Sequence, residues 1–424
     1  MITTPEPLLI TAGRLLRGPA GDLVTGGAVL VAGGAIVAEG PRAEVAAEAA
    51  HDVPTLDFPT ATMLPGLVNG HAHLAMDGGA DPVASLLGSS PERLADDMAR
   101  HAGQLLDCGV TTVRDLGDRG GLSVGLRDAI ASGALPGPRV LAAIAPLTPP
   151  RGHCWFFGGE VADEARMRAM VRRNAAAGAD VIKVMASGGH ITPGAPRMWE
   201  SQFTAGELAA IVAEADEFGL PVAAHAHGVE SIERAISAGV STIEHCTLLA
   251  GENRTELRPG LAEGMAGRGI SACCTVGCDD WRREIAERGE EGARALYSRL
   301  TWLDRHGVTL VPGTDGGVHN ARFDDFAGAL ELYEWLGFPA PRVIEMATVR
   351  AAAALGVDDV TGRIAPGLAA DLLVVDGEPD HTLAALRAIR LVVAAGRVHR
   401  PGAVPGQEKS GSAILARFTS ETWG

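Results

Sequence analysis

The chain has 424 residues, of which 46% are hydrophobic and 21% are charged, so it is globular and can bury a large core in one large or two modest domains. Its formal net charge of −16 disfavours nucleic acid and anionic membranes as partners. The sequence offers no membrane span and no basic signal-peptide region at its start. We therefore expect a cytoplasmic protein that acts on a small molecule and forms a homo-oligomer.

The first predicted elements are short strands between residues 8 and 60, where β-branched residues alternate with glycine turns. From residue 60 to 320 a unit of apolar run, turn and amphipathic helix recurs. One such helix is predicted over 204–218, with a capping box at Thr204 and Glu207. The apolar runs are predicted strands at 63–68, 110–114, 139–144, 181–184, 221–225, 240–245, 269–274 and 308–313. Eight alternating units predict an α/β fold of the (β/α)₈ TIM-barrel type.

Short β segments return at 371–376 and 391–396. Their composition is like that of the segments before residue 60, so the two chain ends are expected to pair in one small β domain beside the barrel. The six cysteines lie in a chain without a signal peptide, and we expect them to be reduced thiols rather than disulfides or a zinc cluster.

Lysine usage singles out one residue. The chain has 36 Lys plus Arg, but only Lys183 and Lys409 are lysines, and Lys183 lies inside the apolar run 180–186. A buried lysine is costly unless it is paired or neutralised. Its amine can lose a proton and react with carbon dioxide to form a carbamate, which a guanidinium cannot do. The alternative is an ion-paired buried lysine.

Potential metal ligands occur at the ends of the predicted strands. His71 and His73 close the first strand, and residues i and i+2 of a strand point to the same side. In a barrel of this type the carboxyl ends of the strands share one mouth, so the other groups converge there too. These groups are Lys183 in the fourth strand, His225 after the fifth, His245 after the sixth and Asp315 after the eighth.

The ligand count favours two metal ions. One is expected on His71, His73 and Asp315, and the other on His225 and His245, with a Lys183 carbamate and a hydroxide as bridges. Imidazole and carboxylate ligands suit zinc, and manganese, iron or cobalt also fit.

At these residues the sequence resembles the amidohydrolase superfamily, in its imidazolonepropionase-like and Xaa-Pro-dipeptidase-like two-metal branch. The segments that carry the resemblance are 64–73, 182–189, 224–228, 243–245, 313–315 and 362–372. The resemblance implies a barrel over 61–360, a β-sandwich domain built from 1–60 and 361–424, and a carboxylated lysine at Lys183. Single-metal deaminases of the superfamily place a Glu just after the fifth-strand His, whereas this chain reads His225-Ala226-His227-Gly228.

Several further polar residues are candidates for contact with substrate. His227 shares the strand end of His225, with a supporting role as the alternative. His153 and Trp155 lie in the loop after the third strand, and His319 follows Asp315 closely. His190 and Arg197 lie in the loop after Lys183, and Arg197 is the strongest anion binder there. Its alternative role is to pair with a surface acid, Glu200 or Glu207.

Together these features predict a hydrolase that cleaves a C–N amide bond in a dipeptide or an N-acyl amino acid. The bridging hydroxide attacks the carbonyl, and Asp315 carries its proton to the leaving amine. The second ion, with His227 or His153, stabilises the oxyanion. The alternatives are a cyclic-amide, lactone or carbamate hydrolase on the same site, then a deaminase, then a non-catalytic scaffold.

Overall fold

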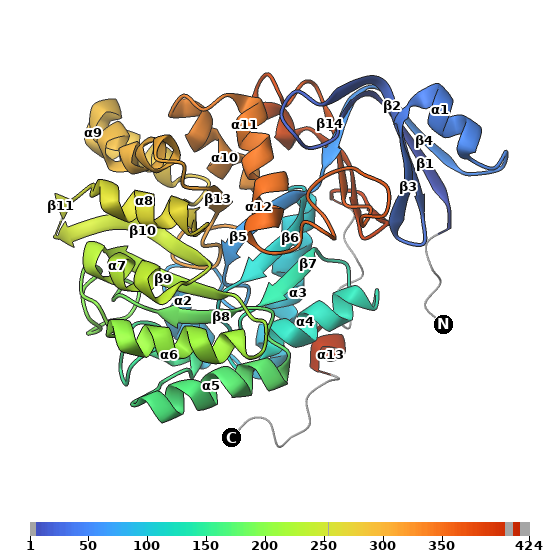
Figure 1. The fold of residues 1–424 in the computed structure, drawn as a ribbon. Coiled ribbons are helices and arrows are strands. Elements are labelled where there is room, and N and C mark those ends of the chain that lie inside the picture. The colour runs from blue at the N-terminus through green and yellow to red at the C-terminus, as the bar shows by residue number, and fades with distance from the viewer. Residues whose placement is uncertain (1–5, 253, 403–409, 416–424) are drawn as a thin grey trace.

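The computed structural model describes residues 6–252, 254–402 and 410–415, which form a mixed α/β fold (Figure 1). Lys409 and the segments 403–409 and 416–424 of the predicted β domain lie outside the described residues. None of the described helices is long and apolar enough to span a membrane.

Strands from the two ends of the chain form one seven-stranded sheet, in the order β16-β15-β14-β4-β1-β2-β3. The antiparallel pairing of β14 with β4 joins the two ends, as expected. Figure 1 shows this sheet beside the parallel strands, with α1 packed on it. The β-sandwich arrangement stays a prediction. The strands are β1 Leu8–Leu16, β2 Leu23–Ala32, β3 Ala35–Pro41, β4 Thr55–Pro65, β14 Leu372–Asp376, β15 Ile389–Ala394 and β16 Arg397–His399.

The described residues contain eight parallel strands, in two sheets of order β13-β12-β10-β9-β8 and β5-β6-β7. Single-residue parallel bridges link the sheets, one from Leu147 to Val184 and one from Ala72 to Gly316. Every residue of β9 is buried, which is typical of a parallel strand covered on both faces. The strands are β5 Leu67–Ala72, β6 Val110–Asp115, β7 Arg139–Ala142, β8 Ile182–Met185, β9 Val222–Gly228, β10 Thr242–Gly251, β12 Ser271–Thr275 and β13 Leu310–Gly313, and a short β11 Arg254–Thr255 pairs with β10.

Helices alternate with these strands along the chain. The predicted capping box is present at the start of α6, where Thr204 and Glu207 bond reciprocally. Ser90 caps the start of α3, where its side chain accepts a hydrogen bond from the backbone N–H of Arg93. Pro91 follows in the first turn, where proline is favoured. The helices are α1 Arg42–Glu48, α2 Pro82–Gly88, α3 Pro91–Asp107, α4 Leu122–Ala131, α5 Glu164–Ala177, α6 Ala205–Asp216, α7 Val229–Ala238, α8 Pro259–Gly267, α9 Asp280–Arg305, α10 Phe326–Trp335, α11 Ala340–Met346, α12 Val349–Ala354 and α13 Ser410–Leu415, with 3₁₀ turns at Trp155–Phe157 and Leu383–Arg387.

The first apolar run, residues 63–68, is not one strand. It contains the end of β4 and the start of β5, so the chain passes there from the seven-stranded sheet into the parallel strands. Pro65 has no N–H to continue a ladder. Gly66 allows the close approach that follows, since a Cβ at this position would lie 2.1 Å from the hydroxyl of Thr111. This junction sets the direction of β5 and hence the position of the histidines at its end.

Candidate functional site

His71, His73 and Asp315 come together where β5 and β13 end. The Nε2 atom of His71 lies 3.4 Å from Nε2 of His73 and 3.2 Å from Oδ1 of Asp315, and His73 Nε2 lies 3.5 Å from the same oxygen. Both rings are buried. The i and i+2 histidines therefore lie side by side, with Asp315 against both rings.

The other ring nitrogens show which protons these histidines carry. Nδ1 of His71 lies 2.8 Å from Glu244, and Nδ1 of His73 lies 3.3 Å from the carbonyl of Gly117. A carboxylate and a carbonyl only accept, so the Nδ1 atom of each ring carries a proton. Burial lowers the pKa of His73 to about 3, which keeps that ring neutral. The two Nε2 atoms and a carboxylate oxygen face one another, and a group of two histidines and one carboxylate in this arrangement could hold a metal ion.

The Oδ1 atom of Asp315 is buried and has no hydrogen-bond partner among the described residues. Burial alone would raise the pKa of this carboxyl, but the nearby His71, His73 and Lys183 hold it below its ordinary value. Its backbone has a φ of 55°, in the left-handed region that few non-glycine residues adopt. The strained turn directs an ionised carboxylate at the two histidines.

Lys183 lies in the middle of β8 and its side chain is completely buried. Its Nζ has no hydrogen-bond partner among the described residues. Burial lowers the pKa of the amine, which favours the neutral, nucleophilic form. The side chain lines one cavity with His73, His225, His245 and Asp315. The ion pair that was the alternative role for this lysine is absent from the described part of the chain.

His225, His227 and His245 form a second cluster, on β9 and β10. One ring nitrogen from each lies within 4.8 Å of the others. The Nε2 atom of His225 lies 3.1 Å from the carbonyl of Gly188, which fixes the proton there and leaves Nδ1 as an acceptor. Burial and the neighbouring rings hold the pKa of all three well below the ordinary value. Neutral, buried imidazoles are the form in which histidine binds metal.

Hydroxyl groups orient two of these rings. His245 Nδ1 lies 2.6 Å from the hydroxyl of Thr275, and His227 Nδ1 lies 2.9 Å from that of Thr247. The backbone N–H of His227 also donates to Ser187, at 3.0 Å. These contacts come from the strands and loops on either side of β9 and β10, so the cluster is held from several elements.

Glu244 is a site residue that the sequence did not single out. It is completely buried, and its carboxylate bonds His71 at 2.8 Å and the guanidinium of Arg114 at 2.8 Å. Burial alone would raise its pKa, but Arg114 and His71 lower it, so the group is ionised. Arg114 and Glu244 thus form a buried salt bridge between β6 and β10. An acid inside the predicted strand 240–245 was the available signal, since a buried carboxylate needs a partner.

Strand alternation would place Glu244 and His245 on opposite sides of β10. His71 nevertheless contacts both, with ring centroids 5.2 Å apart in the case of His245. The backbone explains this, because His245 has a φ of 65° and Cys246 a φ of 48°. Two left-handed residues break the pleat and turn the His245 ring back to the cavity.

The predicted substrate residues divide into two groups. His153 and His190 line the cavity together with His227. His153 is buried, its Nδ1 lies 3.0 Å from the hydroxyl of Thr192, and burial lowers its pKa to about 3. Its ring packs on His225 with centroids 4.6 Å apart. The buried His153 and His227 and the exposed His190 therefore line the same cavity.

The other three candidates lie outside the cavity lining. Arg197 is exposed, and its guanidinium lies 5.5 Å from the ring of Trp199. Its backbone N–H donates to Glu200 at 2.8 Å, but its side chain pairs with neither Glu200 nor Glu207 in the described structure. Trp155 is 39% exposed, while the next residues of its turn are buried, and Phe157 stacks on His73. His319 is exposed and contacts the carbonyl of Gly79 at 3.1 Å.

Residues 62–399 match the model of the amidohydrolase family. The chain belongs to the amidohydrolase family. It is 28% identical over 415 residues to ochratoxinase from Aspergillus niger, a match that covers 88% of this chain and 81% of that protein. It is 30% identical over 414 residues to 5-methylthioadenosine/S-adenosylhomocysteine deaminase from Halobacterium salinarum, with 84% of each chain covered.

Among solved structures, this amidohydrolase is similar to a Xaa-Pro dipeptidase with methionine bound in its active site. The TM-score is 0.80 and the identity 27%, over 93% of this chain and all of that one. The resemblance to the superfamily is therefore confirmed, and the protein is an enzyme of the family that acts on C–N bonds.

The cysteines of this amidohydrolase take little part in the site. All six are free and buried, and burial raises their pKa, as expected for structural thiols. Cys273, His71 and Glu244 form one of the groups that could hold a metal ion, since their ligand atoms lie within 4.8 Å of one another. The grouping of Cys273, Cys274 and Cys278 is not among the groups found in the described residues.

Proposed function

We propose that this protein is a two-metal hydrolase that cleaves a C–N amide bond of a dipeptide or an N-acyl amino acid. The observation that carries the proposal is the amine of Lys183, which is buried, has no hydrogen-bond partner in the described structure, and lines the cavity of the two ligand clusters. A neutral amine in that position is suited to carboxylation.

The residues present fit two divalent ions. His71, His73 and Asp315 would hold one, through the two Nε2 atoms and the carboxylate oxygen that face one another. His225 and His245 would hold the other, and His227 lies close enough to act as a further ligand or as a substrate contact. A carboxylated Lys183 would add oxygen ligands to both. Such ions, with zinc the best match to this donor set, would activate water and polarise the substrate carbonyl.

The protein's own groups have separate tasks in this reaction. Asp315 is ionised and accepts a proton from the attacking water, which it passes to the leaving amine. Glu244 and Thr275 fix the rings of His71 and His245, and so keep their acceptor nitrogens directed into the cavity. His153 and His227 would orient the substrate carbonyl and donate to its developing negative charge. The buried walls exclude bulk water.

The arrangement of strands supports a closed (β/α)₈ barrel over 61–360. The bridge of Leu147 with Val184 and that of Ala72 with Gly316 connect the outer strands of the two parallel sheets. We also propose that the seven-stranded sheet of the chain ends is a separate domain of residues 1–60 and 361–424. Its own apolar cluster includes Ile10, Val29 and Val374.

A deaminase is the second candidate, favoured by the 30% identity to the Halobacterium salinarum enzyme. Two observations count against it. The residue after His225 is alanine, and Asp315 is the one carboxylate among the described residues that line the cavity. Glu230, three residues after His227, is exposed and pairs with Arg234.

The substrate is proposed to carry a carboxylate beside the amide, as the Xaa-Pro dipeptidase and Arg197 together favour. Arg197→Ala should weaken binding of such a substrate far more than binding of its methyl ester. The Arg197 side chain is exposed and lies over the ring of Trp199, in the loop that follows Lys183. Equal losses of binding for the acid and for the ester would show that Arg197 has only a surface role.

The function is tested by assaying the purified, metal-loaded enzyme on N-acyl amino acids, dipeptides, cyclic amides, lactones and adenosine derivatives. Release of a free amine together with a carboxylate, at about two metal ions per chain, is the expected result. Ammonia release from an adenosine derivative would favour the deaminase. One tightly held ion per chain would overturn the two-metal centre and leave the family assignment intact.

A further inference from the structure

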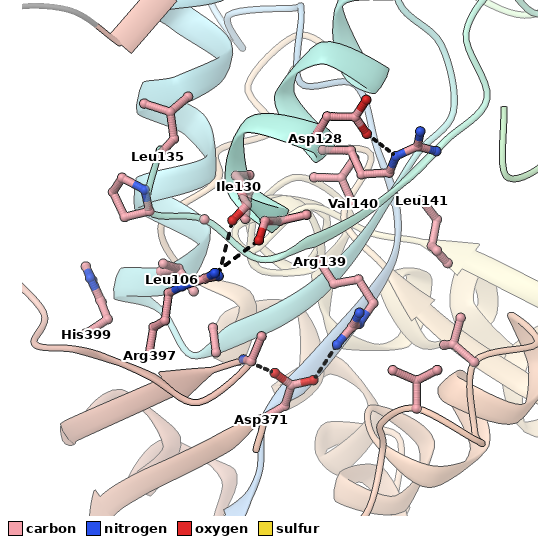
Figure 2. Close-up of a pocket in the computed structure, with 18 of the residues that line it drawn as sticks. Leu106, Asp128, Ile130, Leu135, Arg139, Val140, Leu141, Asp371, Arg397 and His399 are labelled. Atoms are coloured by element: carbon pink, nitrogen blue, oxygen red, sulfur yellow. Dashed lines mark hydrogen bonds and ion pairs between the residues drawn. The ribbon is translucent and has the colours of Figure 1, made fainter. Parts of the chain in front are cut away.

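A second cavity lies far from the histidine clusters, at the amino ends of β7 and β8. It has a volume of about 500 Å³, within the usual range for small-molecule sites. Arg139 begins β7, and Asp180 precedes β8. The opposite wall comes from Asp371 and from residues 394–399 of β15 and β16, so the cavity lies between the parallel strands and the sheet of the chain ends (Figure 2).

The walls of this cavity are mainly apolar. Figure 2 shows Leu106, Ile130, Leu135, Val140 and Leu141 around it. Such walls favour an apolar body, and the crevice between two packed units is a frequent location for ligand sites.

Two arginines supply unused hydrogen-bond donors. The guanidinium of Arg397 donates to the carbonyls of Ile130 and Ala131 at the end of α4, at 3.2 and 3.0 Å, and pairs with no carboxylate in the described structure. A guanidinium has five N–H groups, so three remain for a ligand. Arg139 bonds Asp371 through one nitrogen at 3.4 Å, while its Nε is buried and has no partner among the described residues. A buried donor without an acceptor is costly.

The remaining charges around the cavity are paired. Arg127 contacts Asp180 at 2.7 Å and also Asp128, and His399 contacts Asp107 at 2.7 Å. The two carboxyl oxygens of Asp371 bond Arg139 and the backbone N–H of Ala395. The accessible donors that remain free therefore belong to Arg397, which pairs with no carboxylate in the described structure, and the complementary ligand is an anion.

We propose that this cavity binds a small monocarboxylate with an apolar chain or ring. Its carboxylate would accept from the free donors of Arg397, in a cavity that Arg139 also lines, and its apolar part would lie against the leucine, isoleucine and valine walls. The site does not depend on the proposed reaction. Its ligand contacts both the parallel-strand unit and β16, so binding also stabilises the way these two parts pack.

The test uses calorimetric titration of the metal-loaded enzyme with octanoate, octanol and octylamine, which share one chain and differ in charge. Octanoate should bind one site, more tightly than octanol, and octylamine should bind least. Binding of octanol as tight as that of octanoate would overturn the role of the arginines. Failure of octanoate to bind at millimolar concentration would overturn the site.

A charge change at the cavity rim locates the ligand without disturbing the core. Val398 lines the cavity and is 44% exposed, so Val398→Lys and Val398→Glu should both fold. The dissociation constant of octanoate should be about tenfold lower for the lysine variant than for the glutamate variant, because two unit charges change near the carboxylate. Val37→Lys and Val37→Glu are the matched controls, since Val37 is 50% exposed and outside the cavity.

The control pair should bind octanoate alike, which separates a local effect from the change in net charge. Equal dissociation constants for the two Val398 variants would place octanoate elsewhere, for example at the histidine clusters, and overturn the proposal. Arg397→Gln should also abolish the preference for octanoate over octanol. A retained preference in that variant, with its fold intact, would contradict the assigned role of Arg397.

Discussion

The two ends of the parallel strands differ in how their polar atoms are satisfied. At the carboxyl ends, Lys183 Nζ and Asp315 Oδ1 are buried without a hydrogen-bond partner in the described structure, beside neutral imidazoles. At the amino ends, Arg127 pairs with Asp180 and Arg139 with Asp371. One end leaves ligand atoms open for an added ion, whereas the other uses most of its charges to hold elements together. Changes at the first end should therefore cost metal and turnover, and changes at the second mainly stability.

The largest effect is expected from Lys183→Arg. Arginine keeps the positive charge but cannot form a carbamate, and it places a larger charged group in a fully buried position. Metal binding and turnover should both fall to background, as measured by metal analysis and by the assay on the preferred substrate. Lys409→Arg is the matched control and should leave both unchanged. Full activity of Lys183→Arg would show that Lys183 is not part of the functional site.

Asp315→Asn should remove most turnover while a large part of the metal stays bound. The amide keeps an oxygen ligand but cannot take up a proton, and general acid–base help is typically worth roughly 10²–10⁴-fold in rate. The measurement is kcat together with metal content on the same preparation. A variant that keeps more than about a tenth of the kcat of the parent protein would show that Asp315 is not the proton carrier.

Glu244→Gln tests the support beneath the ligands. The amide can still contact His71, but it lacks the negative charge of the carboxylate. That charge pairs with Arg114 and accepts the hydrogen bond from His71 Nδ1 in the parent protein. Loss of such a supporting group typically lowers metal affinity by about 10–100-fold. Metal dissociation constants by competition with a chelator measure this, with Glu230→Gln as an exposed control. Unchanged affinity would mean that Glu244 serves only the packing of the strands.

The smallest effect concerns His101, a buried histidine of α3 that lies outside the ligand clusters. Its Nδ1 bonds the carbonyl of Leu74 at 2.8 Å, and burial lowers its pKa to about 4. Above pH 6.5 both folded and unfolded states carry it neutral. As pH falls below 6.5 the unfolded state takes up a proton that the folded state refuses, so stability declines until pH 4.

At pH 5 this decline amounts to about 2 kcal/mol relative to pH 7. The comparison is the free energy of unfolding of the parent protein and of His101→Gln, measured at both values. The variant should lose less stability between pH 7 and pH 5 than the parent does. The same loss in both proteins would assign the acid sensitivity to other groups.

The sequence predicted the strands and the order of the candidate ligands well, for physical reasons. The parallel strands are apolar on both faces, so runs such as 222–226 are visible in composition alone. The i and i+2 spacing of His71 and His73 follows directly from the pleat. The scarcity of lysine isolated Lys183 without any structural information.

The rest depended on tertiary geometry. Glu244 and His245 are neighbours that alternation would separate, and only the left-handed backbone at His245 and Cys246 brings both to the cavity. The run 63–68 is continuous in the sequence, but its residues belong to two sheets, because β4 ends before Gly66 and β5 begins after it. The exposure of Arg197 and Trp155 depends on how their loops fold over the strand ends, which loop composition alone does not encode.

The proposed carbamate on Lys183 is tested most directly by ¹³C NMR of the metal-loaded enzyme equilibrated with ¹³C-bicarbonate. With only two lysines, the spectrum has few competing amines. We predict one protein-bound carbamate signal that Lys409→Arg retains and Lys183→Arg loses. An active, metal-loaded enzyme with no such signal, or a signal that survives Lys183→Arg, would contradict it.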